Sequence, residues 1–195
     1  KINILIGTQM VSKGFHFPNL NCIVVLDIDL TSQGHDLRAA EKNLQLYHQL
    51  AGRAGRAGKP AKVYFQTYNI NSDVISQITD QDPFLFLDKE LILRKNYSLP
   101  PFERFIGIII TSSDEDKLKQ ESLILYDELS KNLNCKVLGP VEAPIFKIKK
   151  NYRNRILIRA KKDINIQKKL SEILKIHKSI SGIKLIVDVD PISFN

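Results

Sequence analysis

The sequence is poor in cysteine, and its two cysteines, Cys22 and Cys135, lie far apart. Neither belongs to a CxxC pair, so the cysteines of this chain cannot build a zinc site. Each lies in an apolar run typical of a strand. This placement favours reduced thiols in the core of a cytoplasmic protein.

Long apolar runs are also absent: no stretch approaches the roughly 20 apolar residues of a membrane span. Residues 1–9 (KINILIGTQ) lack the features of a secretory signal and predict a buried strand, so we expect a fragment that opens in mid-strand. The sequence contains no internal repeat and no low-complexity tail. With 43% apolar and 26% charged residues, the chain is expected to be globular and soluble, with no membrane partner.

The net charge of +8 is concentrated in the second half of the chain. Residues 1–97 contain 11 Lys and Arg against 9 Asp and Glu, whereas residues 98–195 contain 18 against 12. An excess of cations favours an anionic partner such as nucleic acid. The second half is therefore the better candidate for that contact.

The first half combines short β-branched runs with a helical pattern in which Leu37, Leu44, Tyr47 and Leu50 recur on related faces. Buried strands flanked by helices indicate an α/β sheet. We predict strands over 2–8, 21–30 and 62–68, and helices over 36–55, 73–79 and 83–97.

The prolines of SLPPF, residues 98–102, remove two backbone donors and disfavour helical geometry in the residue before each. We therefore predict two domains, 1–97 and 98–195. Beyond the break the pattern predicts a strand–helix–strand unit, a hairpin and a helix–strand unit, which fits the ferredoxin-like α+β plan. Strands are predicted over 104–112, 135–140 and 182–191, two more around a basic turn over 145–160, and helices over 117–133 and 165–180.

Two arginines spaced three residues apart lie in QLAGRAGRAG, residues 49–58. Glycine precedes both Arg53 and Arg56, and the small residues around them allow a ligand or another backbone to come close. Guanidinium forks at this spacing suit phosphate oxygens. The alternative is a glycine-rich helix end with solvated arginines.

A second block, GTQMVSKGFHFPNL, follows the first predicted strand over residues 7–20. Loops at the C-terminal edge of a parallel sheet present ligand-binding groups. The alternative is an ordinary loop with a glycine turn, a solvated lysine and a histidine that contacts nothing. The candidate site residues of this block are Thr8, Gln9, Lys13, Gly14 and His16.

A dense cationic run lies in residues 147–169, with ten Lys and Arg against one acid, Asp163. On a strand–turn–strand these side chains are expected to form a compact positive surface that releases counterions on binding a phosphate backbone. The alternative is a solvated basic hairpin. The DNA-binding candidates are Lys147, Lys149, Lys150, Tyr152, Arg153 and Arg155, and the run also contains Arg159, Lys161, Lys162, Lys168 and Lys169.

The string QxxGRxGR resembles motif VI of superfamily-two helicases, and the block 7–20 resembles their motif V. The first resemblance implies that Arg56 is an arginine finger, Arg53 its partner at the phosphates, and Gln49 a sensor of nucleotide state. The second implies that Thr8 and Gln9 face DNA, whereas Lys13, Gly14 and His16 face the nucleotide. Many relatives carry aspartate at the position of His16, which leaves the role of that residue open.

The stretch LGPVEAPIFKIKKNYRNRILIRA, with a PPF break before it and VDVDP after it, resembles the C-terminal domain of the primosomal protein N′ family of replication-restart helicases. The resemblance implies the end of a RecA-like second motor lobe, followed by a small ferredoxin-like DNA-binding domain. It also implies an ATP- and Mg²⁺-dependent 3′ to 5′ helicase that recognises stalled forks and assembles the primosome. The implied partners are branched and single-stranded DNA, the single-stranded DNA-binding protein and other primosome proteins, at the bacterial nucleoid in the cytoplasm.

The chain lacks a phosphate-cradling GKT-type loop, an acidic magnesium-binding motif, and the cysteines for the two structural zinc ions that the resemblance implies for the complete enzyme. ATP and Mg²⁺ are then bound mainly by the missing N-terminal helicase portion. We therefore expect this chain alone to be inactive as an ATPase. The alternative is a stand-alone DNA-binding remnant, and an upstream frame encoding the missing lobe would decide against it.

Overall fold

The computed structural model describes residues 4–8, 20–28, 38–52, 62–71, 75–76 and 83–191. The chain divides into two compact units, Lys1–Asp88 and Lys89–Asn195. None of the helices in the described ranges is both long and apolar enough to span a membrane.

The first unit contains a parallel pair of short strands, β1 (Cys22–Val25) and β2 (Lys62–Phe65), and the helix α1 (Ala39–Ala51). Tyr47 of α1 is 1% exposed, and its ring meets that of Phe65 edge-on at 5.2 Å between centroids. Its hydroxyl donates to the carbonyl of Ile28 at 3.4 Å. One face of α1 is therefore packed on the strand pair, which confirms the α/β prediction for this half.

Three expectations for the first unit need correction or lie outside the described residues. Ile4–Thr8 forms no strand, and Ile4 and Ile6 are 80% and 90% exposed. A β-branched run supplies strand propensity, but a strand also needs a hydrogen-bonded neighbour, and β1 and β2 pair only with each other in the described part of the chain. Cys22 is exposed on β1 rather than in the core. Of the predicted helix 73–79, only residues 75 and 76 are described, and both are helical.

The helix α3 (Pro83–Asn96) crosses from the first unit into the second. Arg94 is buried near its end, where its Nε donates to Glu90 at 2.8 Å and its Nη1 donates to the carbonyl of Pro100 at 3.3 Å. The chain then turns through Ser98–Phe102, as the proline pair predicted.

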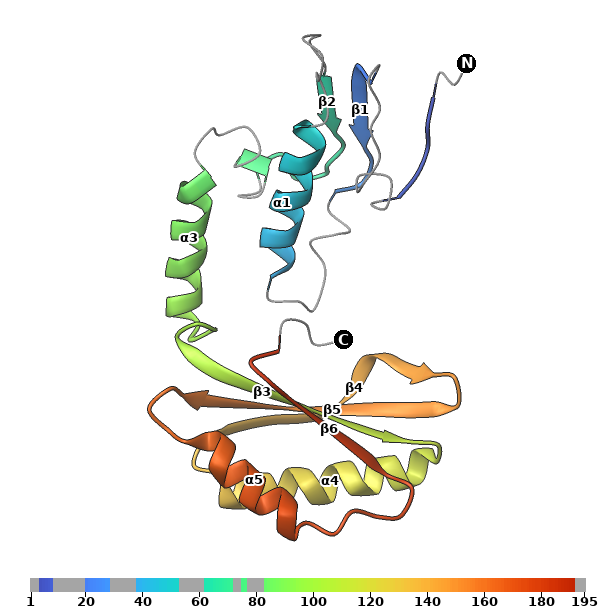
Figure 1. Ribbon diagram of the computed structural model, residues 1–195, viewed down its shortest axis with the longest axis vertical. Helices are drawn as coiled ribbons and strands as arrows, with labels where there is room; N and C mark the ends of the chain where they lie inside the picture. Colours follow the sequence, from blue (N-terminus) through green and yellow to red (C-terminus); the bar gives the residue numbers. More distant parts are fainter. Residues whose placement is uncertain are drawn as a thin grey trace. The chain divides into compact units, whose positions relative to one another are not determined.

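The second unit is a four-stranded antiparallel sheet with two helices on one face (Figure 1). The strand order is β4-β5-β3-β6, and the order of elements along the chain is strand, helix, strand, strand, helix, strand. Its elements are β3 (Glu103–Ser112), α4 (Glu115–Asn132), β4 (Lys136–Ile148), β5 (Asn151–Lys161), α5 (Ile166–Ile176) and β6 (Lys184–Val189).

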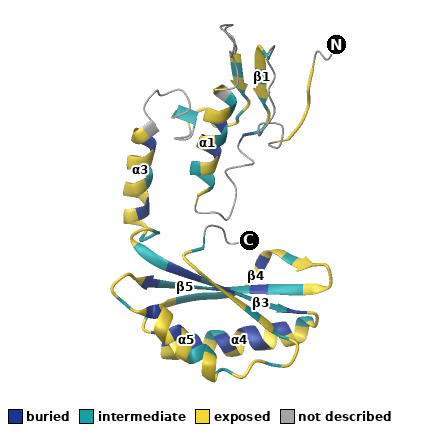
Figure 2. Cartoon of the chain, viewed as in Figure 1, coloured by how far each residue is buried: buried dark blue, intermediate teal, exposed yellow. Residues whose placement is uncertain are grey.

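Alternation along the two central strands separates the faces of this sheet (Figure 2). Ile106, Ile108 and Ile110 of β3, with Ile156 and Ile158 of β5, point into a core shared with α4 and α5. The residues between them point to the opposite face, which we call the outer face. On β5 the outer face carries Arg153, Arg155, Leu157, Arg159 and Lys161.

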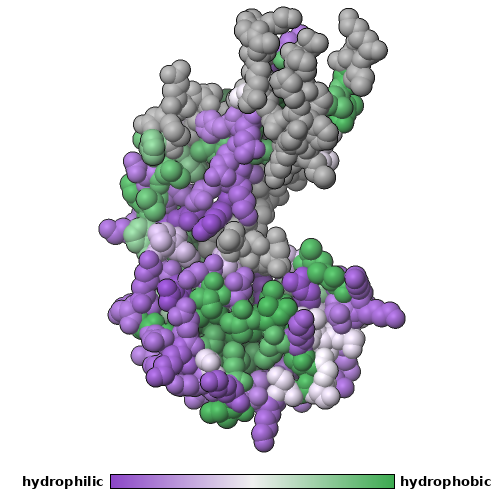
Figure 3. All heavy atoms as spheres, viewed as in Figure 1, coloured by the Kyte–Doolittle hydropathy of each residue, from purple (hydrophilic) through white to green (hydrophobic). Residues whose placement is uncertain are grey.

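Both helices of the second unit begin at a side-chain cap. The carboxylate of Asp114 accepts from the backbone amides of Asp116 and Lys117 at 3.0 and 3.1 Å, and Asn165 accepts from that of Lys168 at 3.2 Å. Each cap satisfies backbone donors that the first turn leaves unpaired. Apolar side chains also gather beside α5 and β6 (Figure 3), where Leu174, Val187 and their neighbours line a groove of about 330 Å³. Lys175 is the one charged residue in that lining, so the groove offers little to nucleic acid.

The strand β4 is longer than the sequence predicted, because register shifts after Leu138 and Glu142 let one edge strand absorb two prolines. Gly139 lies at the first shift with φ +108°, and a Cβ there would come within 2.9 Å of the carbonyl oxygen of Arg155. Both a positive φ and a backbone clash oppose any side chain.

We therefore expect Gly139→Ala to destabilise the second unit by about 1 to 3 kcal/mol. Urea unfolding of the parent and variant chains measures the difference. Gly182→Ala is the matched control for the conformational cost alone, because Gly182 has φ +90° and a Cβ added there would meet nothing within 4 Å. If the two variants were equally stable, the clash at Gly139 would be absent.

Candidate nucleic-acid interface

The basic hairpin joins β4 to β5 through the two residues Lys149 and Lys150. Ile148 pairs with Asn151 on either side of the turn, and Lys149 has a positive φ of 57°, which a two-residue hairpin turn commonly requires. Both lysines are exposed. The turn therefore presents two adjacent cations at the tip of a hydrogen-bonded ladder.

Tyr152 contacts two side chains that precede the turn, those of Phe146 and Lys147. Lys147 lies directly opposite it across the ladder, donates to its hydroxyl at 2.9 Å and places its ammonium 4.3 Å from the ring centroid. On the other side Phe146 packs against Tyr152 at 5.5 Å between centroids, and both rings touch the core. The cation–π contact and the packed rings hold Lys147 in a defined position.

Arg153 and Arg155 extend the positive surface onto the outer face of β5. They lie opposite Thr111 and Ile109 of β3, and both are half-buried. Both arginines lie in the strand and not in the turn, because the turn contains only two residues. Burial lowers the pKa of the Arg155 guanidinium from its ordinary value.

The ten cations of the run do not form one compact surface. At about 3.4 Å per residue, the 11 residues of β5 separate the turn from Lys161 and Lys162 by roughly 35 Å. Lys168 and Lys169 lie on α5, on the other side of the sheet. The five cations from Lys147 to Arg155 lie together with Tyr152 on one hairpin, whereas Arg159 and the four cations at 161–169 do not join them.

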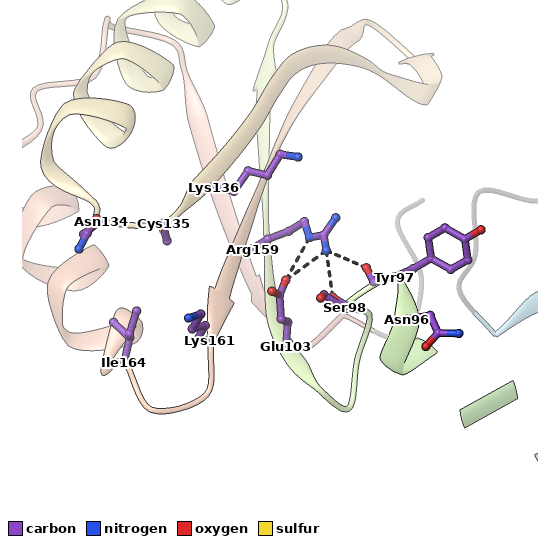
Figure 4. A pocket seen from close by; sticks show the side chains of 10 residues that line it. All are labelled: Asn96, Tyr97, Ser98, Glu103, Asn134, Cys135, Lys136, Arg159, Lys161 and Ile164. Atoms are coloured by element: carbon purple, nitrogen blue, oxygen red, sulfur yellow. Dashed lines mark hydrogen bonds and ion pairs between the residues drawn. The ribbon is translucent and has the colours of Figure 1, made fainter. Parts of the chain in front are cut away.

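Arg159 has a structural role that the sequence did not reveal. Its guanidinium donates from Nε and Nη2 to the same carboxylate oxygen of Glu103, at 3.2 Å each. Nη2 also donates to the carbonyls of Tyr97 and Ser98 at 3.0 and 2.9 Å (Figure 4). Arg159 therefore ties β5 to β3 and to the turn that follows α3. The available signal in the sequence was Glu103, an acid two residues after the proline pair.

The candidates of the first unit are only partly placed. Gln49 lies exposed in the last turn of α1, and Thr8 is exposed outside any strand. Gln9, Lys13, Gly14, His16, Arg53 and Arg56 lie outside the described residues. Among the described residues, no group of three or more His, Cys, Asp or Glu side chains could hold a metal ion.

Comparison with protein families matches both halves of the chain. Residues 1–58, which include both helicase-like motifs, match the helicase conserved C-terminal domain. Residues 95–192, which include the whole sheet and the hairpin, match the primosomal protein N C-terminal domain. The chain belongs to the primosomal protein N family. This confirms the resemblance found in the sequence.

Curated members of the primosomal protein N family align along nearly the whole chain. Replication restart protein PriA of Rickettsia felis is 41% identical over 194 residues, covering 100% of this chain and 30% of the relative. PriA of Bacillus subtilis is 35% identical and covers 91% of this chain and 22% of the relative. PriA of Haemophilus influenzae is also 35% identical, with 98% and 27% covered. The chain thus spans less than a third of the length of these relatives.

Proposed function

We propose that the chain is the C-terminal part of an ATP-dependent 3′ to 5′ DNA helicase that recognises stalled forks and restarts replication by assembling the primosome. The observation that carries the proposal is the succession of the two family matches along one chain, helicase C-terminal domain first and primosomal protein N C-terminal domain second. The relatives named Replication restart protein PriA support the same role.

In this proposal the first unit is part of a RecA-like second motor lobe, which its parallel strand pair and covering helix support. Arg56, Arg53 and Gln49 act at a nucleotide that, with Mg²⁺, is held mainly by the missing lobe. Lys13, Gly14 and His16 approach the nucleotide, and Thr8 and Gln9 approach DNA. This division leaves the chain without ATPase activity of its own.

Residues 98–195 form the DNA-binding domain in this proposal, with a ferredoxin-like fold. The strand order β4-β5-β3-β6, antiparallel throughout and covered by two helices on one face, supports that assignment. Branched and single-stranded DNA are the proposed ligands. The single-stranded DNA-binding protein and other primosome proteins are the proposed protein partners.

The chemistry of the hairpin favours binding to the phosphate backbone. Lys149 and Lys150 supply point charges at the tip, and Arg153 and Arg155 supply guanidinium forks along the strand. Tyr152 is held by Lys147 and Phe146, so its ring is already in contact on two sides. Contacts of this kind carry no base information, so binding should depend on salt and little on sequence.

Replacing Lys149, Lys150, Arg153 and Arg155 together with alanine should therefore weaken binding to forked and random DNA alike. Each lost phosphate contact should flatten the slope of log affinity against log salt by about 0.7 to 0.9, for up to four contacts. Fluorescence anisotropy across a salt series measures both effects.

The matched control removes four exposed cations from or beside the helices of the same unit, Lys117, Lys131, Lys175 and Lys178. This control removes as much positive charge as the hairpin variant, and it should leave the slope of log affinity against log salt unchanged. Circular dichroism checks that both variants keep their helices. If the hairpin variant bound DNA with the parent's affinity and slope, the hairpin would be only a solvated surface.

A further inference from the structure

A cavity of about 630 Å³ lies at the end of β5 far from the basic turn (Figure 4). Its walls come from the end of α3 and the turn after it, from the segment before β4, and from the last residues of β5. Every lining residue belongs to the second unit. The volume lies within the range of small-molecule sites, which is about 300 to 1,000 Å³.

The charged residues of the cavity project from the outer face. Lys136 of β4 lies directly opposite Arg159, and Lys161 lies directly opposite Glu103. Because Arg159 and Lys161 are two residues apart on β5, all four side chains start from the same side of the sheet. The cavity thus combines three cations with one carboxylate.

The carboxylate is already occupied, so the cavity keeps an excess of positive charge. Glu103 accepts two hydrogen bonds from Arg159, which balances its charge. Lys136 and Lys161 are exposed, and their side chains make no hydrogen bond or ion pair with any described residue. Two cations therefore face the cavity without a counter-charge from its lining.

The remaining polar groups of the lining suit an anion. Asn96 and Asn134, which also line the cavity, carry amide donors. Burial raises the pKa of the Cys135 thiol, against a smaller opposite effect of Lys169, so the thiol is neutral and adds no negative charge. A phosphate ester would meet cations and donors here, and the one acid in the lining is paired.

The row of cations on β5 connects this cavity with the hairpin. Arg153, Arg155, Arg159 and Lys161 all lie on the outer face, and residues two apart on a strand are separated by about 6.8 Å. The row from Arg153 to Lys161 is roughly 27 Å long. The aromatic ring on the outer face of the described strands, Phe105, is 3% exposed and lies under Arg159. The strands of this face therefore offer phosphate contacts, whereas an exposed aromatic ring, that of Tyr97, lines the cavity.

We propose that the cavity is a second phosphate-binding site, in which Lys136 and Lys161 contact the backbone of a DNA strand that continues along the outer face from the hairpin. This inference rests on the proposed DNA-binding function of the second unit. Arg159 is a positioning residue, because it holds Glu103 and the turn after α3 in the wall of the site.

The test is fluorescence anisotropy of the full chain with a labelled oligothymidylate of about 16 nucleotides, across a salt series. Lys136→Ala combined with Lys161→Ala should weaken binding and flatten the salt slope by about 1.4, since each single-strand contact contributes about 0.7. Lys117→Ala combined with Lys131→Ala removes the same charge from α4 and should leave the slope at the parent value. The inference is overturned if the cavity variant keeps the salt slope of the parent chain. It is also overturned if the α4 control loses as much affinity and slope as the cavity variant.

Two further measurements distinguish DNA from a free nucleotide as the ligand of the cavity, and the cavity site from the hairpin site. ADP is titrated without DNA: binding that requires Lys136 and Lys161, together with an unchanged DNA slope, would assign the cavity to a free nucleotide and overturn the inference. The fourfold hairpin variant is measured in parallel. If only that variant loses affinity, the hairpin function stands and the cavity site is rejected; if only the cavity variant loses affinity, the cavity site stands and the hairpin proposal fails.

Discussion

Arg56→Ala in the complete protein is expected to lower DNA-stimulated ATP hydrolysis by about 10³- to 10⁵-fold, with a much smaller effect on nucleotide affinity. Arg56 follows the glycine of the second GR pair in QLAGRAGRAG, within the match to the helicase C-terminal domain. A finger arginine acts on charge that develops in the transition state, so its loss reduces turnover more than ground-state binding. The measurement is the ATPase rate at saturating DNA, alongside the affinity for a non-hydrolysable nucleotide.

Two variants sharpen the result for Arg56. Arg56→Lys keeps the charge but loses the planar fork, so it should recover little of the rate. Lys42→Ala removes an exposed cation from α1, in the same unit, and should have near-normal turnover. Near-normal turnover of Arg56→Ala would remove this residue from the active site.

The second half of the chain could be predicted well because its local signals agree with one another. The β-branched run that contains Ile106, Ile108 and Ile110 gave the strand β3, whereas its buried face became clear only in the structure. The apolar spacing of Leu118, Leu125 and Leu129 gave α4, and the prolines at 100 and 101 gave the break before β3. Each signal acts over a few residues, which is the range that sequence patterns describe.

The sequence-based predictions failed where the structure of a segment depends on residues far away in the sequence. Ile4–Thr8 has the composition of a strand but no strand beside it among the described residues. The cationic run is continuous in sequence, yet the length of β5 carries its two ends far apart. Arg159 belongs to that run, but its partners are Glu103 and two carbonyls about 60 positions earlier. No local pattern contains this information.

A buried ion cluster in the second unit was also missed, although it left a signal in the sequence. Glu121 lies three residues after Leu118 and four before Leu125, on the apolar face of α4, and it is fully buried. An acid in such a position requires a partner. The partner is His177, the residue directly after α5, whose Nε2 donates to Glu121 at 2.7 Å and whose Nδ1 donates to Glu128 at 2.6 Å. The backbone amide of Ile180 donates to the second oxygen of Glu121 at 3.0 Å.

This geometry suits a protonated imidazole. A neutral ring has one N–H, whereas both ring nitrogens of His177 face carboxylate oxygens. Burial alone would lower the pKa of His177, but the hydrogen bonds and charges of Glu121 and Glu128 outweigh burial and raise its pKa above the ordinary 6.5. The protonated ring thereby links the end of α5 to the middle of α4.

His177→Gln should therefore destabilise the second unit by about 3 to 5 kcal/mol at pH values below 6.5, because the substitution leaves the buried carboxylate of Glu121 without its cation. A raised pKa in the folded chain means that the stabilisation is fully present below the unfolded pKa and is lost as the pH rises through the folded one. The difference between parent and variant should thus shrink as the pH increases above 6.5. Urea unfolding at a series of pH values, followed by hydrogen exchange of peptides from α4, measures it for this unit alone.

Glu115→Gln, which breaks the exposed pair with Lys119 on the same helix, should change stability little at any of these pH values. A stability difference for His177→Gln that did not vary with pH would show that the ring is neutral in the folded chain and that its contacts with the two carboxylates do not depend on charge.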